Sequence, residues 1–192
     1  MSVRARALAD QLVRAGTGAV RTHVDVDLQV GLTQLEQVLV LREALADQLR
    51  IETVAFPQSG ILASPGVAGL LDEALRLGAD VVGGLDPAGF DGDAEAHLDV
   101  VFGLASRHGT PVDIHLHDLG ARAARQLGMI ADRTVALGMA GRVVVSHAYG
   151  LGTLTATELG AVGERLATAG VAVMTNGPAG PMPPSSPSVR WA

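Results

Sequence analysis

Short apolar runs rich in β-branched residues recur along the chain. They lie at residues 19–26, 51–56, 80–85, 111–115, 142–146 and 171–175. Their spacing of about 30 residues matches one strand plus one crossover helix. The run at 143–145 is apolar at every position, as expected for a strand buried on both faces. Each run therefore predicts one strand of a parallel sheet.

Segments with the ~3.6-residue period of amphipathic helices lie between the predicted strands. They span residues 32–49, 66–77, 94–108, 121–137 and 155–169, and a further helix is expected over 1–16. A glycine follows four of them, at Gly78, Gly109, Gly138 and Gly170. Glycine at these positions favours a left-handed helix end. Thr33 with Glu36, and Thr155 with Glu158, have the spacing of a capping box at a helix start.

The alternation of strands and helices predicts an all-parallel sheet covered by helices. A doubly wound sheet and a (β/α) barrel share this local pattern. Two features favour the barrel: no glycine-rich phosphate loop follows an early strand, and polar residues stand at the carboxyl end of nearly every strand. A whole barrel has eight units in about 250 residues, and this chain has 192 residues. We therefore expect a partial TIM-type (β/α) barrel with about six parallel strands.

The composition narrows the classes of function. Lys and Arg number 14 against 20 Asp and Glu, and aromatic residues make up 3%, which argues against a nucleic-acid partner. With no cysteine, any metal must be held by histidines and carboxylates. No stretch approaches the ~20 apolar residues of a membrane span, and the N-terminal segment lacks the pattern of a signal peptide. We expect a cytoplasmic protein with no membrane partner.

Candidate chemistry gathers at the ends of two predicted strands. Period-two alternation places Asp113, His115 and His117 on one face. His147 ends the next predicted strand after three valines. A rim pair of histidines, or a histidine satisfied within the core, is the structural alternative for each motif. Imidazoles followed by a carboxylate, Asp118, favour a hydrolytic metal site in which the carboxylate moves a proton.

Two further motifs leave their alternatives open. His23 and Asp25 share one face of the run at 19–26 and fit a structural ion pair or a supporting hydrogen bond as well as direct ligation. Gln58 follows Pro57 at a strand end, where its amide suits the donor and acceptor edge of a substrate or a solvated turn. His97 and His108 fall in a predicted helix and are interpreted as structural.

The longer motifs carry a family resemblance. They read VRTHVDV, VAFPQSGIL, EALRLGADVVG, DIH and SH, at residues 20–26, 54–62, 73–83, 113–115 and 146–147. From about Val3 to about Asn176 the chain resembles the cytosine deaminase branch of the amidohydrolase superfamily. The resemblance implies a hydrolase that acts on a C–N bond of a small N-heterocyclic substrate or cyclic amidine through metal-activated water.

The resemblance also implies residue roles. It makes His115 a ligand of one divalent ion, Zn²⁺ or Fe²⁺, places His147 near the reacting water, and gives Gln58 a contact with the substrate. Asp118 stands where the family has a glutamate proton shuttle, and His117 replaces an acidic residue. Because the carboxylate of Asp118 reaches less far than that of a glutamate, a related N-heterocycle or amide is an alternative substrate to cytosine. His23, Asp25 and His117 are interpreted as supporting residues.

The family pattern extends beyond this sequence at both ends. Its first strand carries a His-x-His metal pair and its eighth an aspartate ligand, and neither finds a counterpart here. We therefore expect a truncated barrel equivalent to strands 2–7 over residues 1–176, a disordered Gly/Pro/Ser-rich tail over 177–192, and a metal that is held weakly or not at all.

Two alternatives stay open. In the first, the chain is a catalytically inactive barrel fragment that acts by association with another chain, including a homo-oligomer formed through open sheet edges. In the second, it is a complete doubly wound domain that binds a small ligand.

Overall fold

The computed structural model describes residues 2–175, and the predicted tail over 177–192 lies outside them. Within the described residues the six predicted strands are confirmed. They are β1 (Ala19–Asp25), β2 (Arg50–Phe56), β3 (Val81–Leu85), β4 (Val112–Leu116), β5 (Val143–His147) and β6 (Val171–Met174).

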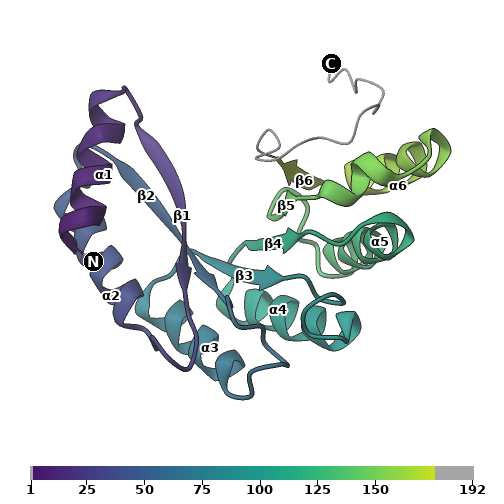
Figure 1. Ribbon diagram of the computed structural model, residues 1–192, viewed down its shortest axis with the longest axis horizontal. Coiled ribbons are helices and arrows are strands. Elements are labelled where there is room, and N and C mark those ends of the chain that lie inside the picture. The colour runs from purple at the N-terminus through teal and green to yellow at the C-terminus, as the bar shows by residue number, and fades with distance from the viewer. Residues whose placement is uncertain (1, 176–192) are drawn as a thin grey trace.

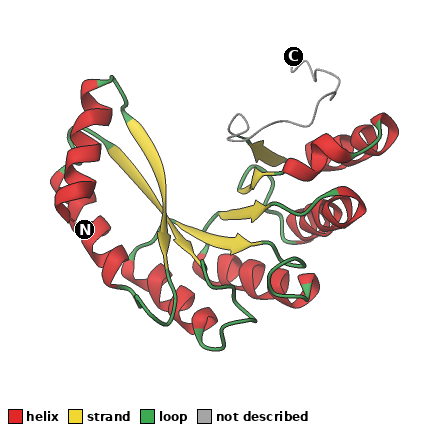
Figure 2. Ribbon diagram, viewed as in Figure 1, coloured by secondary structure: helices red, strands yellow, loops and turns green. Residues whose placement is uncertain are grey.

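The strands are arranged in the sheet in chain order. The order is β1-β2-β3-β4-β5-β6, and every neighbouring pair is parallel. A doubly wound sheet reverses its direction at a switch point, so that alternative is wrong. The sheet curves, and the helices lie along its outer side (Figures 1 and 2). The predicted partial TIM-type barrel is confirmed.

Helices follow the strands as the periodicity predicts. They are α1 (Ser2–Arg14), α2 (Thr33–Ala44), α3 (Val67–Leu77), α4 (Ala94–His108), α5 (Gly120–Ala136) and α6 (Ala156–Ala169), with a short 3₁₀ helix η1 (Tyr149–Thr153). The capping box of Thr155 and Glu158 is confirmed, and the left-handed Gly109 and Gly170 end α4 and α6. These local signals fix the ends of the elements.

Helix α2 differs from its prediction at both ends. Leu32 is its N-cap and no side chain caps it, so the capping box predicted at Thr33 is wrong. The helix ends at Ala44 and not at residue 49. Leu45 and Leu49 continue the apolar period, and both are 1% exposed. They pack into the core from the connection between α2 and β2, and burial alone does not distinguish such a connection from a helix.

The apolar core lies between the sheet and its helices. Ile114 and Leu116 of β4 point into it and are fully buried. Alternation then places Asp113 and His115 on the opposite, concave face of the sheet. The concave face therefore carries the polar residues that the sequence singled out. Over residues 2–175 we find no helix with the length and apolar character of a membrane span.

Candidate metal centre

His115, near the end of β4, lies at the centre of a histidine cluster on the concave face. Its ring centroid is 4.3 Å from that of His23 and 4.6 Å from that of His147. Its Nε2 is 2.9 Å from Nε2 of His23, so one ring donates the hydrogen bond and the other accepts it. Burial, followed by the charge of His23, lowers the pKa of His115 to about 4. The ring is therefore neutral at pH 7, the form that binds a metal ion.

Asp113 is a buried carboxylate on β4, two residues before His115 and on the same face of the sheet. It accepts hydrogen bonds from Ser146 Oγ at 2.6 Å and from Arg21 Nη1 at 2.9 Å, and His23 Nε2 lies 3.6 Å away. Burial alone would raise the pKa of Asp113, but these three partners outweigh it and keep the pKa below its ordinary value. The carboxylate is therefore charged and fixed in orientation.

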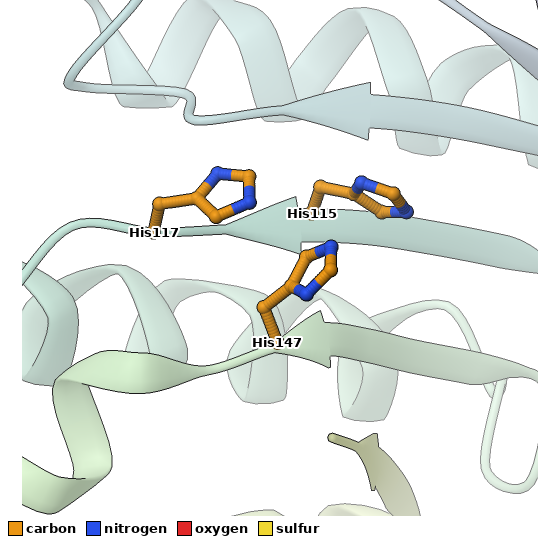
Figure 3. Close-up of side chains that lie close together, drawn as sticks. All are labelled: His115, His117 and His147. Atoms are coloured by element: carbon orange, nitrogen blue, oxygen red, sulfur yellow. The ribbon is translucent and has the colours of Figure 1, made fainter. Parts of the chain in front are cut away.

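His117 follows β4 and is oriented by Asp86 at the end of β3. One carboxylate oxygen of Asp86 accepts from the backbone N–H of His117 at 2.6 Å, and the other lies 2.8 Å from the ring Nδ1. When Nδ1–H donates to Asp86, Nε2 of the neutral ring carries the lone pair. Figure 3 shows the three rings of His115, His117 and His147 gathered at the ends of β4 and β5.

His147 reaches the cluster through an unusual backbone conformation. Its φ is +70° and that of Ala148 is +47°, so two successive residues with side chains are left-handed as the chain leaves β5. Such conformations are uncommon and are concentrated at functional sites. The His147 ring stacks on that of His117 with centroids 4.6 Å apart and lies edge-on to His115. The strained turn thus directs His147 toward its two neighbours.

The cluster offers two groups of potential metal ligands. In each group, three side-chain atoms lie within 4.8 Å of one another. One group is His115, His117 and His147, and the other is His23, Asp113 and His115. In a tetrahedral zinc site, Zn–N bonds of about 2.0–2.1 Å place ligand atoms roughly 3.3 Å apart, so modest side-chain movements would bring either group to that spacing. Imidazoles with one carboxylate suit Zn²⁺ or Fe²⁺, and the residues present fit such an ion.

Asp118 lies beside α5. Its carboxylate accepts a hydrogen bond from Gln126 Nε2 at 2.8 Å and lies 3.5 Å from Arg122 Nη1. Its side chain is 13% exposed, and the backbone at Gly89 packs against it. The predicted role of Asp118 as proton shuttle stays a prediction.

Gln58 and Asp25 border the cluster. Gln58 is exposed in the turn after β2, one residue beyond Pro57, while Phe56 touches the rings of His23 and His115. Burial and the charge of Asp27 raise the pKa of Asp25, against an opposing effect of His23. The substrate contact of Gln58 and the supporting role of Asp25 stay predictions.

Sequence reasoning missed Asp86 and Arg21. Asp86 directly follows β3, and a polar residue at a strand end was a usable signal. Arg21 lies within one of the family motifs, but its contacts run to Glu52 on β2 and Asp113 on β4, which are distant along the chain. No local pattern reveals such a contact.

Comparison with known proteins places this geometry in a family. The profile of the amidohydrolase family matches residues 3–185. The N-isopropylammelide isopropyl amidohydrolase of Pseudomonas sp. (strain ADP) is 38% identical over 138 residues, which make up 72% of this chain and 34% of that protein. The chain thus spans about a third of the length of this curated relative.

Comparison with solved structures points to the same family. N-isopropylammelide isopropylaminohydrolase from Burkholderia multivorans ATCC 17616 superposes with a TM-score of 0.88 and 50% identity, over 90% of this chain and 44% of that one. 5-methylcytosine deaminase from Klebsiella pneumoniae, liganded with phosphonocytosine, gives a TM-score of 0.82 and 30% identity, over 90% and 42%. With its curved parallel sheet, its strand-end histidines and a profile match over most of its length, the chain belongs to the amidohydrolase family.

Proposed function

We propose that this protein is a metal-dependent hydrolase that acts on a C–N bond of a small N-heterocycle or cyclic amidine. The observation that carries the proposal is the cluster of His23, His115, His117 and His147 at the strand ends of an amidohydrolase-family sheet. Active sites of (β/α) barrels lie at this carboxyl-terminal rim.

The names of the relatives support the substrate class. One is named for N-isopropylammelide and another for 5-methylcytosine, and both compounds are N-heterocycles with an exocyclic nitrogen. Gln58 stands at the rim, where its amide offers one donor group and one acceptor. We assign it to the heterocycle, whose ring edge presents the complementary groups.

We assign the other roles in catalysis to the metal ion and to three residues of the cluster. When bound, Zn²⁺ or Fe²⁺ supplies Lewis acidity that lowers the pKa of water to about 7. His115 would hold the ion with its neutral ring, and Asp113 keeps His23 in place beside His115. His147 orients the attacking water or stabilises the charge that develops on the ring.

The reaction requires one proton transfer. Water adds to the ring carbon, the C–N bond breaks, and a proton passes from the water to the leaving nitrogen. Asp118 is the candidate from the sequence for this transfer. It lies three residues after the proposed ligand His115.

A steady-state assay tests the function. We expect the Zn- or Fe-loaded chain to release amine from N-isopropylammelide or from a panel of aminopyrimidines and triazines, and a chelator to abolish the release. Asp118→Ala should lower kcat by about 100-fold and leave the metal bound. Asp132→Ala, which removes an exposed carboxylate of α5 paired with Arg165, is the matched control. Absence of amine release from every loaded preparation would refute the proposed reaction.

A further inference from the structure

A second buried charged group lies outside the histidine cluster. Asp91, in the loop between β3 and α4, has a side chain that is 0% exposed, and so has His97 of α4. The Asp91 carboxylate is 2.6 Å from Nδ1 of His97. A carboxylate is buried only where hydrogen bonds replace its water, so its remaining partners indicate what it does.

Those partners are backbone groups of the loop between β2 and α3. The N–H of Ile61 donates to both carboxylate oxygens, at 3.1 and 3.0 Å, and that of Ala63 donates at 3.0 Å. Burial alone would raise the pKa of Asp91, but His97 and these N–H groups outweigh it and keep the pKa far below its ordinary value. The loop therefore folds around a permanent negative charge.

Gly60 shows how closely the two loops pack. Its φ is +77°, and a Cβ at this position would collide with Asp91 Oδ1 and with the ring of Phe90. Only glycine permits both the left-handed turn and this approach. The backbone two residues after Gln58 is therefore in close contact with the Asp91 side chain.

Gln58 is carried by this same loop. Directly after Gln58, Ser59 Oγ donates to Asp27 at 3.1 Å, and Ser64 Oγ donates to the backbone oxygen of Ser59 at 2.7 Å. The segment that presents Gln58 is therefore fastened between Asp27 and Asp91.

The β3–α4 loop also reaches the histidine cluster. It begins at Asp86, which orients His117 through two hydrogen bonds, and it contains Asp91, which holds the segment after Gln58. One short loop thus contacts both the proposed substrate side and the proposed metal side. The hydrogen bonds of Asp91 run to Ile61, Ala63 and His97 and to no histidine of the cluster among the described residues. We therefore expect a displacement of Asp91 to move Gln58 and to leave the potential metal ligands in place.

His97 of α4 fixes Asp91 from the side of the core. Its ring packs against Gly84 of β3, where a Cβ would lie 2.9 Å from Nε2, and within residues 2–175 that Nε2 has no hydrogen-bond partner. The ring is wedged between the sheet and the loop, with Nδ1 directed at the carboxylate.

We propose that Asp91, held by His97, is a positioning residue that fixes the segment 58–63 and so sets how tightly the site binds an N-heterocycle through Gln58. The proposal rests on the proposed function for the role of Gln58. Asp91 itself does not touch the substrate. It acts through the backbone N–H groups of Ile61 and Ala63.

The test compares Asp91→Asn with a control from the same loop. Asp93→Ala removes the side-chain cap of α4, which accepts from Ala96 N–H at 3.1 Å and makes no hydrogen bond to the Gln58 loop, so it destabilises the fold without releasing Gln58. For the full zinc-loaded chain and both variants, we would measure the amide exchange of Ile61 and Ala63, the bound zinc, and the Kd for N-isopropylammelide.

In Asp91→Asn we expect exchange at Ile61 and Ala63 to rise about tenfold or more, because a charged acceptor is lost. The Kd should rise by about tenfold with zinc content unchanged, and Asp93→Ala should keep the wild-type Kd. Unchanged exchange at both amides, or an unchanged Kd in Asp91→Asn, would overturn the proposal. If wild type binds no probe, the proposed function fails, and the exchange rates alone then decide whether Asp91 anchors the loop.

Discussion

The protonation of His115 couples the candidate site to folding. Its pKa lies at about 4 in the folded chain against an ordinary value of 6.5, so between these pH values the unfolded chain binds a proton that the folded chain does not. Stability therefore falls as pH drops from 6.5 toward 4.

We predict that His115→Gln makes the Tm of the metal-free chain less sensitive to pH in this window. Differential scanning calorimetry in the presence of a chelator measures the effect. A variant whose Tm falls as steeply as that of wild type between pH 6.5 and 4 would show that His115 titrates normally in the folded chain.

Two glycines should respond in opposite ways to the same substitution. Gly60→Ala introduces strain at φ +77° and a collision with Asp91, so we predict a loss of about 1–3 kcal/mol. Gly163 is exposed within α6, and a Cβ added there would meet nothing within 4 Å, so Gly163→Ala should stabilise by up to about 1 kcal/mol. Urea unfolding of both variants checks the signs, and a neutral Gly60→Ala would contradict the close packing of the two loops.

Single residues were predictable where their neighbours lie nearby in sequence. Alternation along β4 placed His115 and His117 on one face, and the structure brings both to His147. The partners of Asp113 were not predictable, because Arg21 and Ser146 come from β1 and β5 and meet it only once the sheet forms. The Asp91 anchor was missed for the same reason: its loop and that of Ile61 are separate connections.

The ends of elements depend on side chains that the sequence shows directly. At α6, Thr155 Oγ1 accepts from Glu158 N–H at 3.3 Å, and the Glu158 carboxylate accepts from Thr155 N–H at 2.8 Å. Thr155→Ala should cost about 1 kcal/mol of the free energy of unfolding. Thr157→Ala, on the exposed surface of the same helix, is the control and should change it little. Equal effects of the two substitutions would mean that the capping box contributes nothing.

Elements without such signals were predicted less well. Strand positions followed from apolar runs, and helices closed by Gly109 and Gly170 ended where expected. Helix α2 has no glycine at its end, and the buried Leu45 and Leu49 continue its apolar period into the connection with β2. A helix boundary is read from capping chemistry and not from burial.

The sheet of the described residues has two outer edges, on β1 and β6, that pair with no other strand between residues 2 and 175. Unpaired N–H and C=O groups at an edge favour pairing with another chain. We predict that the 192-residue chain associates in a concentration-dependent way, and that Val173→Lys on β6 weakens the association. Sedimentation velocity tests both statements. A monomer at every concentration would contradict the prediction and would also remove the basis of a role through association.

Repeated strand–helix units with right-handed crossovers predict a parallel sheet, and the polar residues at the strand ends favoured the strand order of a barrel over that of a doubly wound sheet. The complete fold brings distant histidines together. His23, His115 and His147 come from β1, β4 and β5 and meet on one concave face. Their meeting depends on sheet curvature, which no local sequence pattern encodes.

A metal-dependent hydrolase requires that this cluster retain an ion. The decisive measurement is the zinc and iron content of the purified chain after metal loading and dialysis, for wild type, His115→Ala and the control His108→Ala, whose ring pairs with Asp72 away from the cluster. The sequence predicts weak or absent metal binding, but the structure brings together two groups of potential ligands that share His115. We therefore predict about one ion per chain in wild type and in His108→Ala, and its loss in His115→Ala. A wild-type chain that retains no ion, or a His115→Ala variant that retains as much as wild type, would contradict the proposed metal centre.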